Sequence, residues 1–223
     1  MADTRQLILN IQPEAAPRFD NFMPGDNLEL LLALDTMARG ELKESVAYIW
    51  GAPGSGRSHL LQATVAETRR FGREAGYASD GKLPDDLSGL LAVDDVDKLD
   101  AEGQVRLFSL INQAREGAGT VLATGPVAPA QLVVREDLAT RLSWGLVFGL
   151  RPLNEADRST AVRERAASLG LNLADDVVRY LLSHGRRDLP SLLATVDALD
   201  GYSLSLKRPV TVPLVREWMQ SRP

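Results

Sequence analysis

Residues 51–59 have the types and the spacing of a loop that binds phosphate. They read Gly-Ala-Pro-Gly-Ser-Gly-Arg-Ser-His and follow the apolar run 48–50. Glycines let the backbone curl so that successive N–H groups point at one anion, and the helix predicted to begin near Arg57 adds its positive end. The pattern predicts a P-loop, and the alternative is a plain glycine turn between a strand and a helix. The predicted nucleotide contacts here are Gly51, Pro53, Gly54, Ser55, Gly56, Arg57, Ser58 and His59.

One position departs from the P-loop pattern. Arg57 stands where the motif has lysine. Arginine keeps a positive charge and phosphate donors, but it presents a planar fork instead of a compact point charge. We therefore expect nucleotide binding, whereas the substitution argues against efficient hydrolysis by this chain.

Two carboxylates end the apolar run that starts at Gly89. They are Asp94 and Asp95, and a fully apolar strand before them indicates a sheet buried on both faces. At this distance after a P-loop, we expect Asp94 to hold Mg²⁺ together with the hydroxyl of Ser58, and Asp95 to orient the attacking water. The alternative is that either aspartate caps the element that follows.

Three residues outside these motifs are further candidates for nucleotide contacts. Thr124 lies near the end of a strand predicted over 120–125, and its hydroxyl either senses a γ-phosphate or begins a turn. Phe22 either stacks near a base or packs in the core. Arg187 lies where a helix of the second domain begins, and it either reaches back to the phosphates or lies on the surface.

The predicted elements change in kind after Arg151. Before it, strands alternate with helices; the helices are predicted over 27–38, 57–71 and 102–116, and the strands over 48–50, 77–79, 89–95, 120–125 and 146–150. After it, only helices are predicted, over 155–168, 175–184, 189–200 and 213–220, with Gly170, Gly185 and Gly201 near their ends. We expect an α/β base with a parallel sheet over 19–150 and a small α-helical lid over 151–223.

Composition narrows the class of protein. The chain has 223 residues, 44% hydrophobic content and a net charge of −5, which predicts a packed protein and argues against one whose main task is to hold nucleic acid. It has no cysteine, so disulfides, thiolate metal sites and cysteine nucleophiles are excluded. No run of 18 apolar residues and no signal-peptide pattern is present. We expect a cytoplasmic protein without membrane contact.

Residues 1–18 precede the base. Gln6 to Ile11 form a short apolar run headed by glutamine, and a proline-punctuated linker follows it. Such a segment is either an edge strand of the core or a docking peptide. The sequence leaves this choice open.

Together, these residues resemble AAA+ ATPases of the DnaA branch. The P-loop with Arg57 and the following His-Leu-Leu, the pair Asp94-Asp95, and the segment 137–145 with Arg141 carry the resemblance, which covers residues 6–220. The resemblance implies an AAA+ base with a helical lid. It also implies that Arg141 is an arginine finger presented to a neighbour's nucleotide, that Thr124 and Arg187 take the two sensor positions, and that the ligand is ADP or ATP with Mg²⁺.

Within that branch, the chain is similar to DnaA-homologous regulators and not to an initiator. An initiator would continue past the lid into a DNA-binding domain, so we expect no direct sequence-specific DNA binding. The resemblance implies that the regulator binds the sliding clamp (the β subunit of DNA polymerase III) on DNA and stimulates hydrolysis of DnaA-bound ATP, which prevents re-initiation. The implied clamp contacts are Gln6, Leu7, Leu9 and Ile11.

Two other functions stay open. One is an ATPase that acts alone, such as a small-molecule kinase, although no second phosphate-acceptor motif is present. The other is an adaptor or loader-type protein of the DnaA branch whose nucleotide site is structural. The oligomeric state, a homodimer included, is not determined by the sequence.

Overall fold

A parallel five-stranded sheet forms the centre of residues 16–152. The computed structural model of the chain describes residues 16–186 and 188–221, and it divides them into two units between Pro152 and Leu153. The strands of the first unit run in the order β2-β3-β4-β1-β5. Their bounds are β1 (Val46–Trp50), β2 (Ala75–Ala78), β3 (Gly89–Val93), β4 (Gly119–Gly125) and β5 (Leu146–Gly149). This arrangement confirms the predicted fold class.

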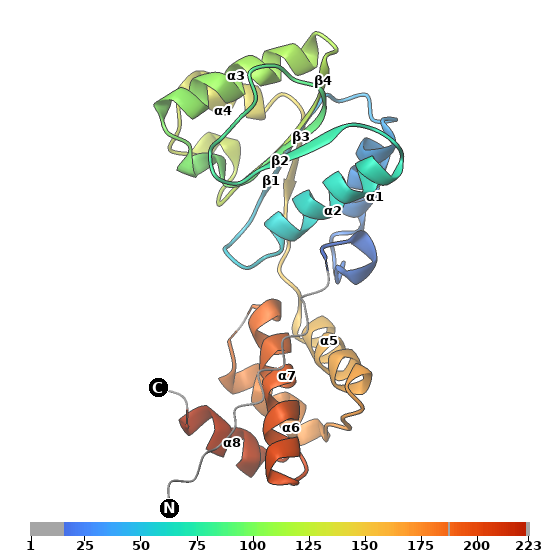
Figure 1. Cartoon of the computed structure of the whole chain (residues 1–223). Helices are drawn as coiled ribbons and strands as arrows, with labels where there is room; N and C mark the ends of the chain where they lie inside the picture. Colours follow the sequence, from blue (N-terminus) through green and yellow to red (C-terminus); the bar gives the residue numbers. More distant parts are fainter. Residues whose placement is uncertain (1–15, 187, 222–223) are drawn as a thin grey trace, which may run out of the picture. The chain divides into compact units, whose positions relative to one another are not determined.

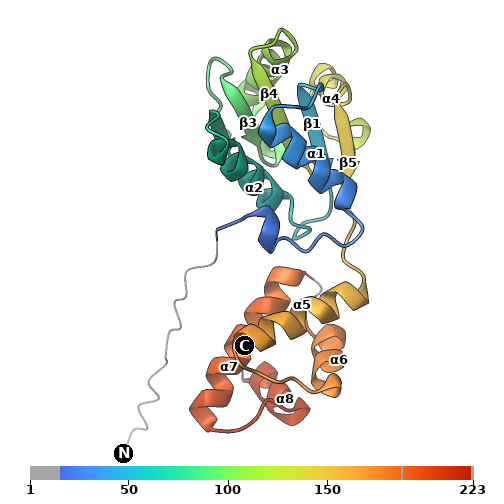
Figure 2. The same cartoon turned by 90° about the vertical axis from the view of Figure 1, so that its right-hand side faces the viewer.

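Helices cover both faces of the sheet, as Figures 1 and 2 show. Helices α1 (Leu28–Arg39) and α2 (Arg57–Arg70) pack on one face, and α3 (Ala101–Arg115) and α4 (Glu136–Leu142) pack on the other. Strand β1 shows why two faces must be covered: Tyr48 packs with the α3 and α4 side, while Ile49 packs with the α1 and α2 side, and both are fully buried. Successive residues of a strand point to opposite faces, so an apolar strand requires two cores.

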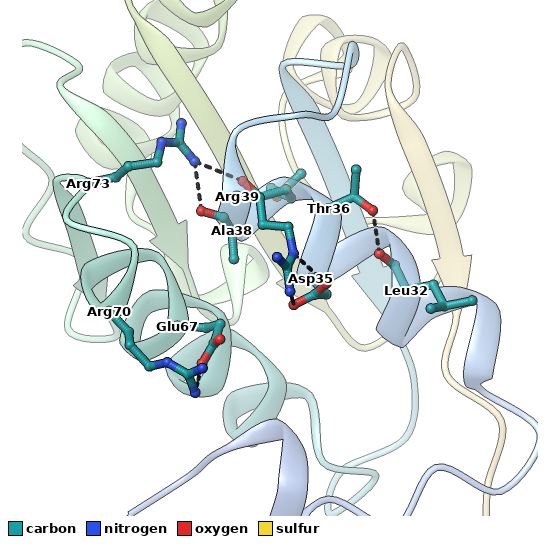
Figure 3. Close-up of polar contacts among 9 residues, drawn as sticks. Leu32, Asp35, Thr36, Ala38, Arg39, Glu67, Arg70 and Arg73 are labelled. Carbon is teal, nitrogen blue, oxygen red and sulfur yellow. Dashed lines mark hydrogen bonds and ion pairs between the residues drawn. The ribbon is translucent and has the colours of Figure 1, made fainter.

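The loop after α2 is joined to the end of α1 by hydrogen bonds from Arg73 (Figure 3). Arg73 donates hydrogen bonds of 3.0 and 2.9 Å to the carbonyls of Met37 and Ala38 in the last turn of α1, and the Met37 carbonyl also accepts the N–H of Gly40. Gly40 ends this helix with φ +78°, and a Cβ on it would lie 2.6 Å from the Arg73 guanidinium carbon. Glycine at residue 40 thus lets one arginine cap α1.

Residues 153–221 form a separate helical unit. It contains α5 (Glu155–Ser168), α6 (Asp175–His184), α7 (Leu189–Leu206) and α8 (Val212–Gln220), packed around a core that includes Val162, Leu181 and Val196. The side chains of Asn154 and Asp188 cap the starts of α5 and α7. The prediction that α7 ends near Gly201 is wrong, because the helix runs through this glycine to Leu206, where apolar packing outweighs the low helix propensity of glycine.

No helix in the described part of the chain is long and apolar enough to cross a membrane.

The first unit also contains three short 3₁₀ helices, which connect its larger elements: η1 (Phe19–Asn21), η2 (Val96–Lys98) and η3 (Pro129–Gln131).

Candidate functional site

The carboxyl ends of β1, β3 and β4 meet at one edge of the sheet. The helix after β1 covers one face and the helices after β3 and β4 cover the other, and ligands of open α/β sheets bind where the connections change faces in this way. The loop that begins at Gly51, the Asp94-Asp95 pair and Thr124 all follow or end these strands. The tertiary structure thus brings the three predicted motifs of the base to one place.

The loop between β1 and α2 has the backbone of an anion-binding turn. Gly54 and Gly56 adopt positive φ angles of 76° and 102°, which side chains with a Cβ rarely tolerate. The N–H of Gly51 donates to the carbonyl of Gly125, 3.3 Å away, and ties the loop to the end of β4. Inside the loop, the buried hydroxyl oxygen of Ser55 has no hydrogen-bond partner among the described residues. Buried polar atoms are normally paired, so this atom fits a polar ligand in the loop.

Phe22 lies against this loop. A Cβ on Gly56 would come within 2.8 Å of the Phe22 ring, so the ring covers the glycine closely. Its centroid lies 5.6 Å from that of the His59 ring, and Nε2 of His59 is 2.9 Å from the carbonyl oxygen of Arg18. Phe22 also packs against the core of the α1 and α2 face. The ring therefore has a core role, and its position beside the loop is also compatible with a contact to a base.

Asp94 is the centre of a buried hydrogen-bond network. It accepts a short hydrogen bond from the hydroxyl of Thr124 and one of 2.9 Å from the hydroxyl of Tyr77. Burial raises the pKa of Asp94, but hydrogen bonds from Ser58, Thr124 and Tyr77 and the charge of Arg57 outweigh it, so the pKa lies below its usual value. Asp94 is thus an anion beside the hydroxyl of Ser58, as the predicted Mg²⁺ site requires.

Thr124 has a structural role that the sequence left open. Besides donating to Asp94, its hydroxyl oxygen accepts a hydrogen bond of 3.1 Å from the backbone N–H of Asp95. The threonine thereby holds the turn that carries both aspartates. Its contact with a γ-phosphate stays a prediction.

Asp95 is engaged by two cations. Its Oδ1 lies 3.0 Å from Nη2 of Arg57, and its Oδ2 lies 2.7 Å from Nζ of Lys98. The residue has a left-handed backbone, with φ 48° and ψ 60°, which turns its carboxylate toward the P-loop arginine. The other terminal nitrogen of Arg57, Nη1, is buried without a partner among the described residues. Arg57 therefore pairs with Asp95 through Nη2, and its Nη1 is available to donate a hydrogen bond to a phosphate.

Arg141 lies at the other edge of the sheet. Arg141 belongs to the last turn of α4, and the chain then enters β5 through Gly145. The backbone of Gly145 lies against the start of β1, because a Cβ on this glycine would lie 1.8 Å from the Val46 carbonyl oxygen. The P-loop instead follows Trp50 at the end of β1, about 13 Å along the strand. The structure therefore separates Arg141 from the predicted P-loop of its own chain.

Aromatic rings surround the Arg141 guanidinium. Its carbon Cζ lies 3.6 Å from the centroid of the Trp144 ring and 5.0 Å from that of Phe108. Such cation–π contacts orient an arginine side chain without using its N–H donors. The donors stay available for an anion.

The remaining predicted site residues lie outside the described part of the chain. They are Arg187 and the peptide residues Gln6, Leu7, Leu9 and Ile11. Among the described residues, no group of three or more His, Cys, Asp or Glu could hold a metal ion by itself. Sequence reasoning missed Tyr77 and Lys98, and the signal for Lys98 was its spacing of three residues from Asp95 on a short helical turn.

Comparison with known proteins adds to this geometry. Residues 155–219 match the family model described as "Hda, lid domain". The crystal structure of domain III of the replication initiation protein DnaA from Thermotoga maritima is similar to this chain, with a TM-score of 0.76 and 21% identity over 94% of this chain and 99% of that one. The helical unit is thus similar to the lid domain of Hda, and the chain as a whole has the AAA+ fold of DnaA domain III.

Other solved structures share the fold of this chain. AMPPCP-bound DnaA from Aquifex aeolicus has a TM-score of 0.73 and 20% identity over 93% of this chain and 70% of that one. A point mutant of RuvB from Thermotoga maritima has a TM-score of 0.71 and 17% identity over 92% of this chain and 72% of that one. At these identities the comparison concerns the fold, and the Hda match concerns the lid residues 155–219.

Proposed function

We propose that this protein is an Hda-like regulator of replication initiation that stimulates hydrolysis of DnaA-bound ATP to ADP, together with the DNA-loaded sliding clamp. The protein acts in trans: it supplies Arg141 to the nucleotide of DnaA and does not need efficient hydrolysis of its own. One observation carries the proposal. Arg141 lies at the sheet edge opposite to the P-loop of its own chain.

A guanidinium inserted at a neighbour's γ-phosphate stabilises the charge that grows in the transition state. Such fingers contribute roughly 10³–10⁵ in rate. Arg141 is suited to this role because its terminal donors are not used by a carboxylate in the described part of the chain, and because Trp144 holds the group by its face.

The P-loop of this chain is proposed to bind ADP or ATP, with Ser58 and Asp94 on Mg²⁺. Mg²⁺ commonly takes one or two protein ligands and fills its other positions with phosphate oxygens and water, so one hydroxyl and one carboxylate are a sufficient set. Arg57 and the loop N–H groups would hold the phosphates, and Phe22 and His59 would border the nucleoside. Asp95, already paired with Arg57 and Lys98, is a poor candidate for orienting water unless a nucleotide displaces Arg57.

The proposed clamp contact lies in residues 6–11. Gln6 would supply a directional hydrogen bond, and Leu7, Leu9 and Ile11 would supply apolar contacts. A Gln6→Ala, Leu9→Ala double variant should fold normally and bind ADP, but it should not co-elute with the clamp. Retained co-elution would contradict the docking peptide.

The central experiment follows DnaA-bound ATP over time with DNA-loaded clamp and this protein. Arg141→Ala is expected to keep the fold, ADP binding and clamp binding but to lose stimulation, and Arg141→Lys is expected to fail largely because a point charge cannot reproduce the fork. Arg135→Ala is a matched control, since Arg135 lies next to α4 but is paired with Asp137 at 2.7 Å. Full stimulation by a stable Arg141→Ala protein would overturn the proposal and favour an adaptor with a structural nucleotide site.

A further inference from the structure

Two arginine side chains make cation–π contacts with the indole ring of Trp144. Besides Arg141, the guanidinium carbon of Arg115 lies 4.0 Å from the centroid of the Trp144 ring. Arg115 is the last residue of α3, and Arg141 lies in the last turn of α4, so the packing of these two helices brings both cations to the same indole. The side chain of Trp144 is itself partly exposed.

Neither cation is neutralised inside the described part of the chain. No carboxylate oxygen lies within 4.0 Å of either guanidinium there, and Nε of Arg141 is buried without a hydrogen-bond partner. Both arginines line a surface pocket of about 480 Å³, together with Asn112 and Glu116. The pocket thus holds two cations and one carboxylate that pairs with neither.

Two like charges on one ring repel each other, and an anion that bridges them removes this repulsion. Arginine presents N–H donors in a fixed fork that matches phosphate oxygens, so a polyphosphate can contact two such forks at once. The indole limits the positions of the two long arginine side chains before the anion binds. Because less side-chain freedom is then lost on reaching the transition state, this ordering increases the rate.

We propose that Trp144 is the positioning residue for Arg141, and that Arg115 is a second direct contact to the polyphosphate of the partner's nucleotide. The inference rests on the proposed function, because it assigns Arg141 the role of a finger in trans. It adds two residues to that site. Trp144 acts through the arginines, whereas Arg115 touches the anion.

The test uses the full chain in the assay of DnaA-bound ATP with DNA-loaded clamp. Trp144→Leu should lower the maximal stimulated rate by about 2- to 30-fold, the range that corresponds to the loss of one cation–π contact. Trp144→Phe should restore most of that loss, because a smaller ring still offers a face. The concentration of this protein that gives half-maximal stimulation should stay within a factor of about two, since a positioning residue changes the rate and not the affinity.

Arg115→Ala should lower the maximal rate by about 10- to 100-fold, the range for a hydrogen bond to a charged group. The Arg115→Ala, Arg141→Ala double variant should be no slower than Arg141→Ala alone, because groups that act as a unit are not additive. Arg39→Ala is the matched control: Arg39 also stacks on an aromatic ring, 4.7 Å from the centroid of Phe71, but it lies on the opposite face of the sheet. It should stimulate as well as the unmodified chain.

The outcomes separate the two proposals. If Arg141→Ala loses stimulation while Trp144→Leu and Arg115→Ala keep it, the inference is wrong and the finger assignment stands. If Trp144→Leu raises the half-maximal concentration without changing the maximal rate, Trp144 is an interface contact and not a positioning residue. If Arg141→Ala keeps full stimulation, both proposals fall. Melting temperature and ADP binding are measured for each variant, and Arg115→Ala supplies the test should Trp144→Leu not fold.

Discussion

The guanidinium of Arg57 lies 3.0 Å from the carboxylate of Asp95, with only 11% and 22% of the two side chains exposed. This pair joins the P-loop to the turn after β3. A phosphate bound in the loop and the carboxylate of Asp95 would both interact with the Arg57 guanidinium and would compete for its N–H donors. From this pair we expect Arg57 to be compatible with the proposed nucleotide binding and unfavourable for turnover.

Replacing Arg57 tests whether its free nitrogen reaches the nucleotide. Arg57→Ala should weaken ADP binding by about 1.5–3 kcal/mol, the range for hydrogen bonds to charged groups, as measured by calorimetry. Arg70→Ala removes an exposed arginine from the same helix and should leave the affinity for ADP unchanged. An Arg57→Ala protein that is folded and binds ADP normally would contradict the site.

Replacing Asp95 tests whether its carboxylate competes with a bound phosphate for Arg57. Asp95→Asn leaves Arg57 without its carboxylate partner, so ADP and ATP should both bind more tightly, by about 1.4- to 5-fold, since a partly exposed ion pair contributes about 0.2–1 kcal/mol. Asp97→Asn removes an exposed neighbouring carboxylate from η2 and serves as the control. Weaker binding of both nucleotides by Asp95→Asn would show that Asp95 supports the ligand and does not compete with it.

The network around Asp94 makes a pH-dependent contribution to stability. Its pKa is lowered in the folded state, so the stabilisation is present above the unfolded pKa of about 3.9 and is lost as the pH falls through the folded pKa. Tyr77→Phe removes one hydrogen bond to this carboxylate and should reduce the free energy of unfolding by about 1–2 kcal/mol near pH 7. The difference should shrink at acid pH, as the pH falls through the lowered pKa of Asp94 in the folded state.

Urea unfolding at the two pH values measures this effect. Tyr48→Phe is the control, because the buried hydroxyl of Tyr48 donates to the neutral carbonyl of Val127, 2.8 Å away. Its cost should not change over the same acid range. A cost of Tyr77→Phe that stays constant from neutral to acid pH would mean that Asp94 is not the relevant acceptor.

Gly201 offers a site for stabilisation. It lies inside α7, outside the left-handed region, and a Cβ there would meet no atom within 4 Å. Gly201→Ala should therefore raise the free energy of unfolding by about 0.5–1 kcal/mol, because alanine loses less backbone freedom on folding. Gly170→Ala is a matched contrast in equally open space, but φ there is +75°, so it should destabilise. A destabilised Gly201→Ala protein in thermal unfolding would contradict the argument.

Much of the fold could be predicted because its signals are local. The apolar runs before Gly51 and Asp94 predict buried strands from composition alone, and the change to helices only after Arg151 predicts a second unit. The exact end of α7 could not be predicted, because Gly201 is a helix stop by propensity and only packing against the rest of the unit extends the helix to Leu206.

For the site, the sequence by itself determined which residue types follow which strands: a glycine loop with Arg57 and Ser58 after one, two aspartates after another. It also determined that Arg141 precedes the last strand. Only the tertiary structure decided that Arg57 pairs with Asp95, that Thr124 and Tyr77 hold Asp94, and that Arg115 and Arg141 share one indole. The physical reason is that parallel strands separated by helices bring residues distant in the sequence to a common edge of the sheet. A local sequence pattern does not determine at which edge a residue lies or which side chain it contacts there.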